Sequence, residues 1–339
     1  MDEFYWVPAN NREMLAFSVR YARSRASKIF LASAPTTSVS AVGTYNNLIG
    51  FSVAPSGGDL AVSYRAGKPP AGTEAPTWEG VLRIVPLAGG TGRVVYTLPK
   101  GGYVMLEPGW WPNGKGLLFW DDPAGSASVA ADGLALDSLD LATGKVSPLT
   151  TMLTYRNWIS WSPSGRELAL VAGPNRIIWD NAKHIVLCKM PAAQCRPVPL
   201  PRRGSMALCP AWAPAGSLVY DLALGTTSPA ALVPPGLKVI GNGPFNLATV
   251  DEWYSGMRLY ESSSLVASGH PLASAPKGAH DPLVTRRGLF FIRGAGLWWL
   301  GNGASQPLEV ASGLEGPGYY GAGNYYGYIA WYKELAWHS

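Results

Sequence analysis

The sequence has few charged residues. Only 14% of its 339 residues are Asp, Glu, Lys or Arg, against roughly 25% in an average soluble domain. The net charge is +5, and the nearest approach to a basic run is two arginine pairs, Arg202-Arg203 and Arg286-Arg287. Nucleic-acid-binding proteins concentrate their cations on one stripe or helix, so we expect no nucleic-acid partner. The shortage of Glu and Lys also favours strands over helices.

Long apolar runs are absent too. No stretch approaches the roughly 18 residues that a membrane span needs, so we expect no membrane insertion within this chain. The first residues carry Asp2, Glu3, Arg12 and Glu13, which a signal peptide would not. The protein is therefore either cytoplasmic or the product of an export signal that has been removed. Low charge and abundant Ser, Thr, Gly and Trp favour the second alternative, an extracytoplasmic protein that is periplasmic, secreted or at the cell surface.

Cysteine is scarce, with three residues in the chain. Cys188 and Cys195 flank a segment in which Pro191 can occupy the second position of a turn over residues 190–193. Extending the hairpin outward from that turn pairs Cys188 with Cys195, at a separation that a disulfide can bridge. A bridge would indicate an oxidising compartment, and the alternative is two reduced thiols in a hairpin. Cys209 is interpreted as a small buried hydrophobic residue.

Histidine is scarce as well, with four residues. No two of them have the short spacing typical of a metal site, and none has an obvious partner set for a Ser-His-Asp triad. A complete Gly-x-Ser-x-Gly elbow is absent. The sequence therefore predicts no catalytic residues, no metal and no cofactor.

Glycine, proline and tryptophan are plentiful, at 40, 29 and 14 residues, and they recur in one phrase. Its clearest copy is Trp161-Ser-Pro163-Ser-Gly165, followed by an apolar strand. Related copies begin at Trp110 and Trp212, and weaker ones at Trp6, Val53, Trp253 and Leu283. Repetition of this kind identifies the fold class before any other feature does.

Each copy indicates the same structural unit. An apolar strand ends at the Trp, a Pro-x-Gly turn follows, and three more strands complete an antiparallel sheet. Four-stranded sheets repeated every 40–50 residues predict a β-propeller. We expect a single all-β domain over residues 1–339 with seven blades, or alternatively eight, in which residues 315–339 close the ring or form part of an extra blade. The recurring Trp is then a wedge packed between neighbouring blades.

The phrase resembles the repeat of TolB-type β-propellers, which runs Trp-Ser-Pro-Asp-Gly-Lys before an apolar strand. The resemblance covers about residues 1–300 and weakens after residue 250. Ser164, Asn113, Ala215 and Ser56 stand where the family has Asp, and the family's N-terminal α/β domain has no counterpart here. The resemblance therefore implies the fold and a general capacity to bind ligands or proteins. Similar blades form the non-catalytic domain of prolyl-oligopeptidase-like peptidases, and their hydrolase domain also has no counterpart here.

Polar residues on the strand before each Trp should converge on the central channel of a propeller. These candidate ligand-binding residues are Glu107, Asn157, Asp251, Glu252, His280 and Asp281. His280-Asp281 is either a channel-lining acid/base or metal pair, or a solvent-facing loop dipeptide. Asp121, Asp122, Asp137 and Asp140 form a further acidic group that could bind Ca²⁺ or simply form turns.

Three functions remain open. The first is a non-enzymatic binding or scaffold propeller, a monomer that recognises a protein, peptide or glycan on one rim or at the channel. The second is a glycosidase or lyase with carboxylates in the funnel, which would need a carboxylate pair at a suitable separation. The third is the ectodomain of an envelope-anchored, receptor-like protein.

Overall fold

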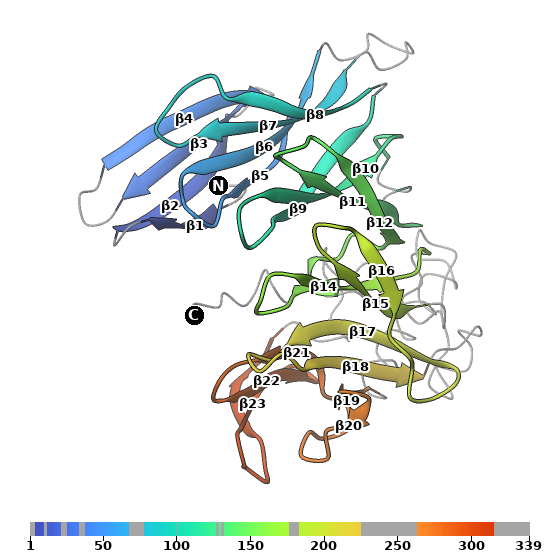
Figure 1. Cartoon of the computed structure of the whole chain (residues 1–339). Coiled ribbons are helices and arrows are strands. Elements are labelled where there is room, and N and C mark those ends of the chain that lie inside the picture. Colours follow the sequence, from blue (N-terminus) through green and yellow to red (C-terminus); the bar gives the residue numbers. More distant parts are fainter. Residues whose placement is uncertain are drawn as a thin grey trace, which may run out of the picture. The chain divides into compact units, whose positions relative to one another are not determined.

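The described part of the protein consists mainly of antiparallel β-sheets, as a computed structural model shows (Figure 1). The structure describes residues 4–9, 12–21, 26–33, 38–67, 78–99, 101–126, 129, 132–175, 183–224 and 263–314. Within them lie six four-stranded sheets in which each strand pairs with the next along the chain. The all-β prediction is thereby confirmed, and the sheets are consistent with propeller blades.

The chain divides into two compact units, Met1–Thr154 and Tyr155–Ser339. The first unit contains three of the sheets, with strands β1 (Phe4–Ala9), β2 (Arg12–Arg20), β3 (Ala26–Ser33) and β4 (Ser38–Asn46); β5 (Leu48–Val53), β6 (Asp59–Ala66), β7 (Glu79–Pro86) and β8 (Arg93–Leu98); and β9 (Tyr103–Trp110), β10 (Gly116–Asp122), β11 (Leu134–Asp140) and β12 (Val146–Met152).

The second unit contains the other three sheets and a short 3-10 helix, η1 (Arg156–Trp158), which leads into β13. The strands are β13 (Ile159–Trp161), β14 (Glu167–Ala172), β15 (His184–Lys189) and β16 (Gln194–Pro197); β17 (Ser205–Trp212), β18 (Leu218–Leu224), β19 (Ser264–Ala267) and β20 (His270–Pro271); and β21 (His280–Val284), β22 (Gly288–Arg293), β23 (Gly296–Gly301) and β24 (Leu308–Ser312). Among the described residues, no helix has the length and apolarity needed to cross a bilayer.

The repeated Pro-x-Gly phrase forms the same turn wherever the structure describes it. The glycine takes a positive φ, and its N–H donates to the carbonyl of the residue three positions earlier. The four copies are Gly57 to Ala54, Gly114 to Trp111, Gly165 to Ser162 and Gly216 to Ala213. A positive φ is costly for any residue with a Cβ, which explains why glycine stands at this position in each copy.

The phrase tryptophans connect neighbouring sheets within each unit. In the first unit, Trp110 on β9 donates its indole Nε1–H to the carbonyl of Ser52 on β5, at 3.0 Å. In the second, Trp212 on β17 makes the equivalent bond to Ser160 on β13, at 3.2 Å. The two acceptor residues occupy equivalent positions: Ser52 and Ser160 stand directly before Val53 and Trp161, the residues that begin the phrase in the preceding copy. The predicted wedge is therefore also a hydrogen-bonded contact.

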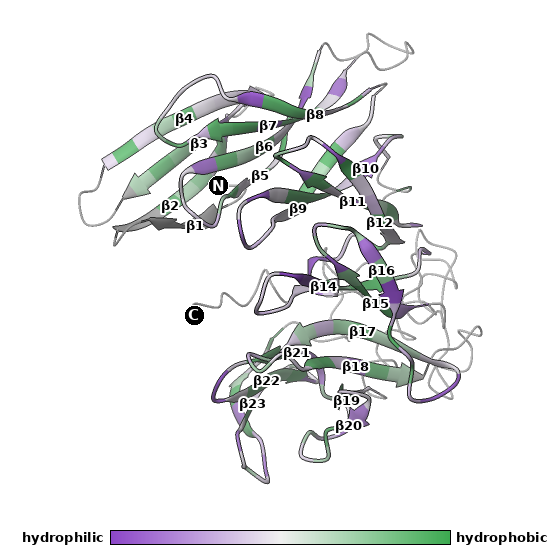
Figure 2. Cartoon of the chain, in the orientation of Figure 1, coloured by the Kyte–Doolittle hydropathy of each residue, from purple (hydrophilic) through white to green (hydrophobic). Residues whose placement is uncertain are grey.

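Apolar side chains fill the space between adjacent sheets of the first unit. One cluster joins β7 to β9 and β10 through Leu82, Ile84, Leu106, Leu117 and Phe119, all of them buried. The hydropathy colouring shows β7 and β10 as predominantly apolar strands (Figure 2). Strands covered on both faces read as continuous apolar runs, whereas half-exposed strands alternate.

Six sheets are described against the seven predicted blades, so the described residues do not confirm the count of seven. The copy expected at Trp253 lies outside the described residues, as does the segment 315–339. Residues 225–262 fall between β18 and β19, which are hydrogen-bonded neighbours in one sheet. The segment containing Trp253 therefore interrupts a blade between its second and third strands, and does not follow a completed one.

Candidate functional site

Two matching bulges bring chemically active side chains together in the second unit. Between Leu208 and Ala211, β17 carries one residue more than its partner β18. Between His280 and Leu283, β21 carries one residue more than β22. Each bulge holds a residue followed by proline, Cys209-Pro210 and Asp281-Pro282. Such bulges re-aim side chains and are common beside functional sites.

Both residues before proline have unusual backbone angles. The φ of Cys209 is 47° and that of Asp281 is 50°. Side-chain-bearing residues rarely adopt this left-handed region, at a cost of order 1–3 kcal/mol. The surrounding structure therefore holds these two side chains in place against a local preference.

Asp221 on β18 completes the group. One ligand-capable atom from each of Cys209, Asp221 and Asp281 lies within 4.8 Å of the other two. The backbone N–H of Asp281 donates to Asp221 Oδ2 at 3.1 Å, which ties the β21 bulge to β18. We call Cys209, Asp221 and Asp281 the Cys-Asp-Asp cluster.

Two further polar side chains contact the cluster. Asn157 of η1 donates its amide N–H to Asp281 Oδ1 at 2.6 Å and lies 3.6 Å from Cys209 Sγ. His280 Nδ1 lies 2.9 Å from Asp281 Oδ2. The cluster and its contacts therefore come from all three described sheets of the second unit: β17 and β18 share one sheet, β21 belongs to another, and η1 leads into β13 of the third.

Burial is the largest influence on the pKa values of Cys209 and Asp221. Cys209 is 4% exposed and Asp221 is 1% exposed. Loss of hydration raises the pKa of the Asp221 carboxyl well above its ordinary value, and the neighbouring Asp281 carboxylate raises it further. Desolvation likewise raises the pKa of the Cys209 thiol, with added contributions from Asp281 and Asp221. Without a cation, this site favours protonated forms of Asp221 and Cys209.

Asp221 Oδ1 is buried and has no hydrogen-bond partner among the described residues. An unsatisfied buried carboxylate oxygen costs several kcal/mol unless a proton or a cation compensates it. The arrangement can therefore hold a proton or bind a metal ion. A large substrate would not reach it, because the side chain of Asp281 is only 8% exposed.

Of the six predicted channel residues, the structure brings three together: Asn157, His280 and Asp281. Glu107 lies on β9 in the first unit. Asp251 and Glu252 lie outside the described residues. The predicted site as a set therefore stays a prediction, while half of its members are now placed in contact.

Sequence reasoning missed Asp221 and gave Cys209 only a packing role. A usable signal was present, since Glu107-Pro108, Cys209-Pro210 and Asp281-Pro282 all stand three residues before the end of the first strand of a copy. Recurrence of a residue-proline pair at one repeat position predicts a recurring bulge. Asp221 had no comparable signal, because it sits within an apolar strand.

The acidic group of the first unit divides between two roles. Asp122 Oδ1 accepts the N–H of Ala124, and Asp140 Oδ1 accepts those of Ala142 and Thr143. These two residues form turns, one of the two alternatives read from the sequence. Asp121 instead accepts the Tyr96 hydroxyl, and burial raises its pKa to about 6, with a smaller contribution from Asp137.

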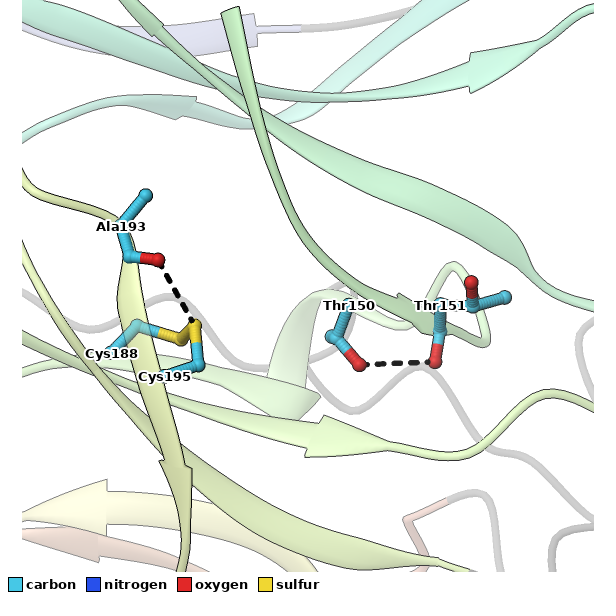
Figure 3. Close-up of a disulfide and its surroundings, with 5 residues drawn as sticks. All are labelled: Thr150, Thr151, Cys188, Ala193 and Cys195. Carbon is cyan, nitrogen blue, oxygen red and sulfur yellow. Dashed lines mark hydrogen bonds between the residues drawn. A yellow bond between two sulfur atoms is a disulfide. The ribbon is translucent and has the colours of Figure 1, made fainter.

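Cys188 and Cys195 form a disulfide (Figure 3). They are directly opposed on β15 and β16, with Lys189 opposite Gln194 one step nearer the turn. This is the register that the sequence indicated. The Met190–Pro191 peptide bond in the turn is cis.

A groove of about 690 Å³ lies at the turn edge of two adjacent sheets in the first unit. Its walls come from the start of β6, the β7–β8 turn, the β9–β10 turn and the end of β11. The residues lining it are Asp59, Ile84, Pro86, Gly90, Thr91, Gly92, Arg93, Trp110, Gly114, Lys115, Leu141 and Ala142. Arg93 and Lys115 are exposed there, giving the groove two cations against one carboxylate.

Comparison with known proteins shows the fold alone. No protein-family model and no curated protein sequence matches the chain. Among solved structures, it is similar to prolyl endopeptidases, with 8% identity over 88% of this chain and 40% of that one and a TM-score of 0.55. It is also similar to a puromycin-hydrolyzing peptidase of Mycobacterium tuberculosis, with 11% identity over 92% and 45% of the two chains and a TM-score of 0.54.

A third similarity is to a putative TolB from Agrobacterium tumefaciens, with 17% identity over 66% of this chain and 72% of that one and a TM-score of 0.38. The chain spans less than half the length of each peptidase. The two peptidase similarities agree with the six described meandering sheets, and the fold is consistent with a β-propeller.

Proposed function

We propose that this protein is a non-enzymatic binding propeller that recognises a protein, peptide or glycan. The observation that carries the proposal is the 690 Å³ groove at the turn edge of the first unit. Ligand sites are concave and combine apolar walls with a few polar groups. Ile84, Pro86 and Leu141 supply the apolar walls, and Arg93 and Lys115 supply the charge.

The groove favours an extended peptide of acidic character. Its two cations outnumber its one carboxylate, and the whole chain carries a net charge of +5. Electrostatic complementarity of this kind speeds encounter and selects partners. Two hydrogen bonds help to hold the walls: Arg83 donates to the carbonyl of Thr91 at 3.0 Å, and Arg93 donates to that of Leu141 at 3.5 Å.

The test is a selection from a displayed random-peptide library in parallel with a glycan array. The reversal Arg93→Glu with Lys115→Glu should weaken binding of the selected acidic peptides by at least about tenfold, the equivalent of 1.4 kcal/mol. Arg202→Glu with Arg203→Glu is the matched control, because it makes the same charge change at exposed positions of the second unit. Equal loss in both variants, or no ligand from either screen, would contradict the proposal.

The enzymatic alternative has weaker support. Glycoside hydrolysis needs two carboxyl groups about 5–10 Å apart that flank an accessible substrate. The described carboxylates of the Cys-Asp-Asp cluster lie close together, but Asp221 is buried and the side chain of Asp281 is only 8% exposed. A binding role therefore agrees better with the described residues than a glycosidase or lyase does.

We propose an extracytoplasmic location, including that of a receptor-like ectodomain. The Cys188–Cys195 disulfide supports it, because such bonds persist mainly in oxidising compartments. Thiol titration of native protein, isolated without reductant, should find one thiol only after denaturation, since Cys209 is buried. Three thiols in the denatured protein would contradict the proposal.

We further propose seven blades in one domain. Six sheets are described, and residues 315–339 follow the last of them along the chain, so they would supply strands of the seventh. Closure of the ring would remove the exposed strand edges that an open array leaves. An experimental structure of the whole chain with six blades would overturn this count.

A further inference from the structure

We propose that Cys209, Asp221 and Asp281 form a binding site for one divalent transition-metal ion of the Zn²⁺ type. The site goes beyond the ligand-binding role proposed above and lies in the other unit. It also departs from the expectation, drawn from sequence, that the chain binds no metal.

The first argument is the set of donor atoms. A thiolate sulfur and two carboxylate oxygens are donors that Zn²⁺ accepts in proteins. One such atom from each residue already lies within 4.8 Å of the other two. Tetrahedral ligands at bond lengths of about 2.0–2.3 Å stand about 3.3–3.8 Å apart. The side chains therefore need only a small adjustment to enclose an ion.

The second argument is independent of the first and concerns Asp221 alone. This side chain is 1% exposed, and its Oδ1 has no hydrogen-bond partner among the described residues. Its other oxygen is engaged by the backbone N–H of Asp281. A cation bound by Asp221 would supply an interaction for Oδ1 that no geometric hydrogen bond from a described residue provides.

The third argument is charge. With all three groups ionised, the cluster would hold three negative charges within the second unit, a state that a bound cation would favour. Among the described residues, neither carboxylate contacts a lysine or an arginine, and the basic side chain that Asp281 contacts is the imidazole of His280. Buried anions are paired or coordinate metals. A divalent ion would reverse the effect of burial and favour the thiolate.

The surroundings resemble the outer shell of metal sites. His280 contacts Asp281 Oδ2, and Asn157 donates to Asp281 Oδ1. Such partners orient ligating carboxylates and tune their affinity. Because the ligands come from β17, β18 and β21, with Asn157 added from η1, the ion would link the sheets of the second unit.

The experiment uses the full chain, purified without chelator and then treated to remove metal. Zn²⁺ titration by calorimetry should give one site per chain. The variants Cys209→Ser and Asp221→Asn should each lower the affinity at least about tenfold. Asp137→Asn is the matched control, because it also removes a buried carboxyl with a raised pKa, but in the first unit. Its affinity should equal that of the wild type.

Co²⁺ provides a second readout that does not depend on affinity. A thiolate-to-cobalt charge-transfer band should appear with the wild type and with Cys188→Ser/Cys195→Ser, where Cys209 is the remaining thiol. The band should be absent in Cys209→Ser. Circular dichroism of each metal-free variant establishes that it is folded. No binding of Zn²⁺ or Co²⁺ by the folded wild type, or binding that Cys209→Ser and Asp221→Asn leave unchanged, would overturn the proposal.

Discussion

Asp121 in the first unit is a carboxyl whose protonation depends on its neighbours. Burial raises its pKa to about 6, from an ordinary value of 3.8. The folded protein therefore holds this proton at pH values where the unfolded chain releases it. The resulting stabilisation is complete below about pH 4 and is lost as the pH rises through 6.

The variant Asp121→Asn should remove this pH dependence. After a discount for partial exposure, we expect it to gain about 1 kcal/mol over the wild type between pH 4 and pH 7. Urea unfolding followed by tryptophan fluorescence at several pH values measures the difference. Tyr96→Phe should move the wild-type trend to higher pH, because the Tyr96 hydroxyl bond lowers the pKa of Asp121. A difference between wild type and Asp121→Asn that does not change with pH would contradict this assignment.

Gly114 is a glycine whose role depends on its backbone conformation and not on the space around it. Its φ is +69°, and a Cβ there would meet nothing within 4 Å. Gly114→Ala should therefore cost about 1 kcal/mol through conformational strain, with no steric clash. Gly58 is the matched control from another copy of the turn, because its φ is not positive and a Cβ would meet only Ser56 Oγ at 3.7 Å. Chemical denaturation should find Gly58→Ala unchanged or slightly more stable, and equal losses in both variants would refute the backbone explanation.

At the scale of elements, the hydrogen bonds donated by the tryptophan indoles add to the stability of the contact between neighbouring sheets. Trp110→Phe keeps most of the ring but leaves the Ser52 carbonyl without its donor. We expect a loss of about 1–2 kcal/mol. Trp161→Phe is the control, because the Trp161 Nε1 has no partner among the described residues. Its loss in the same denaturation experiment should be smaller, and a larger loss would show that the hydrogen bond contributes little.

The two residue-proline bulges matter at the same scale. Without the extra residue in β17 and β21, the following side chains would face the opposite side of each sheet. The bulges let the rest of each strand keep its apolar packing while Cys209 and Asp281 turn toward Asp221. The Cys-Asp-Asp cluster therefore depends on the two bulges, and regular strand pairing alone would not bring its side chains together.

At the scale of the whole molecule, the open matter is whether the two compact units unfold together. The single-domain prediction, with a closed ring, requires one cooperative transition. Trp110→Ala in the first unit and Trp212→Ala in the second should then lower the same midpoint, by about 2–4 °C for each kcal/mol lost. Differential scanning calorimetry of the full chain measures this. Two transitions, each shifted by only one of the variants, would show that the units unfold separately.

Much of the fold could be predicted because it depends on residues that are close together in the sequence. The turn at Gly165, the strand ending at Trp161 and the Cys188–Cys195 register all depend on residues within ten positions of one another. Repetition then multiplied each local signal along the chain. The blade count could not be settled in this way, because the segment containing Trp253 lies between two strands of one sheet and yet resembles a separate copy.

The sequence by itself determined the class of the fold, the Pro-x-Gly turns and the wedge role of the tryptophans, because each depends on short-range backbone preference or on repeated burial. Only the tertiary structure decided that Cys209, Asp221 and Asp281 meet. These residues are separated by 12 and 60 positions, and their contact depends on which sheets are neighbours and on where each strand bulges. No local preference of Asp221 indicates that its carboxyl is buried without a donor, because burial is a property of the packed sheets around it.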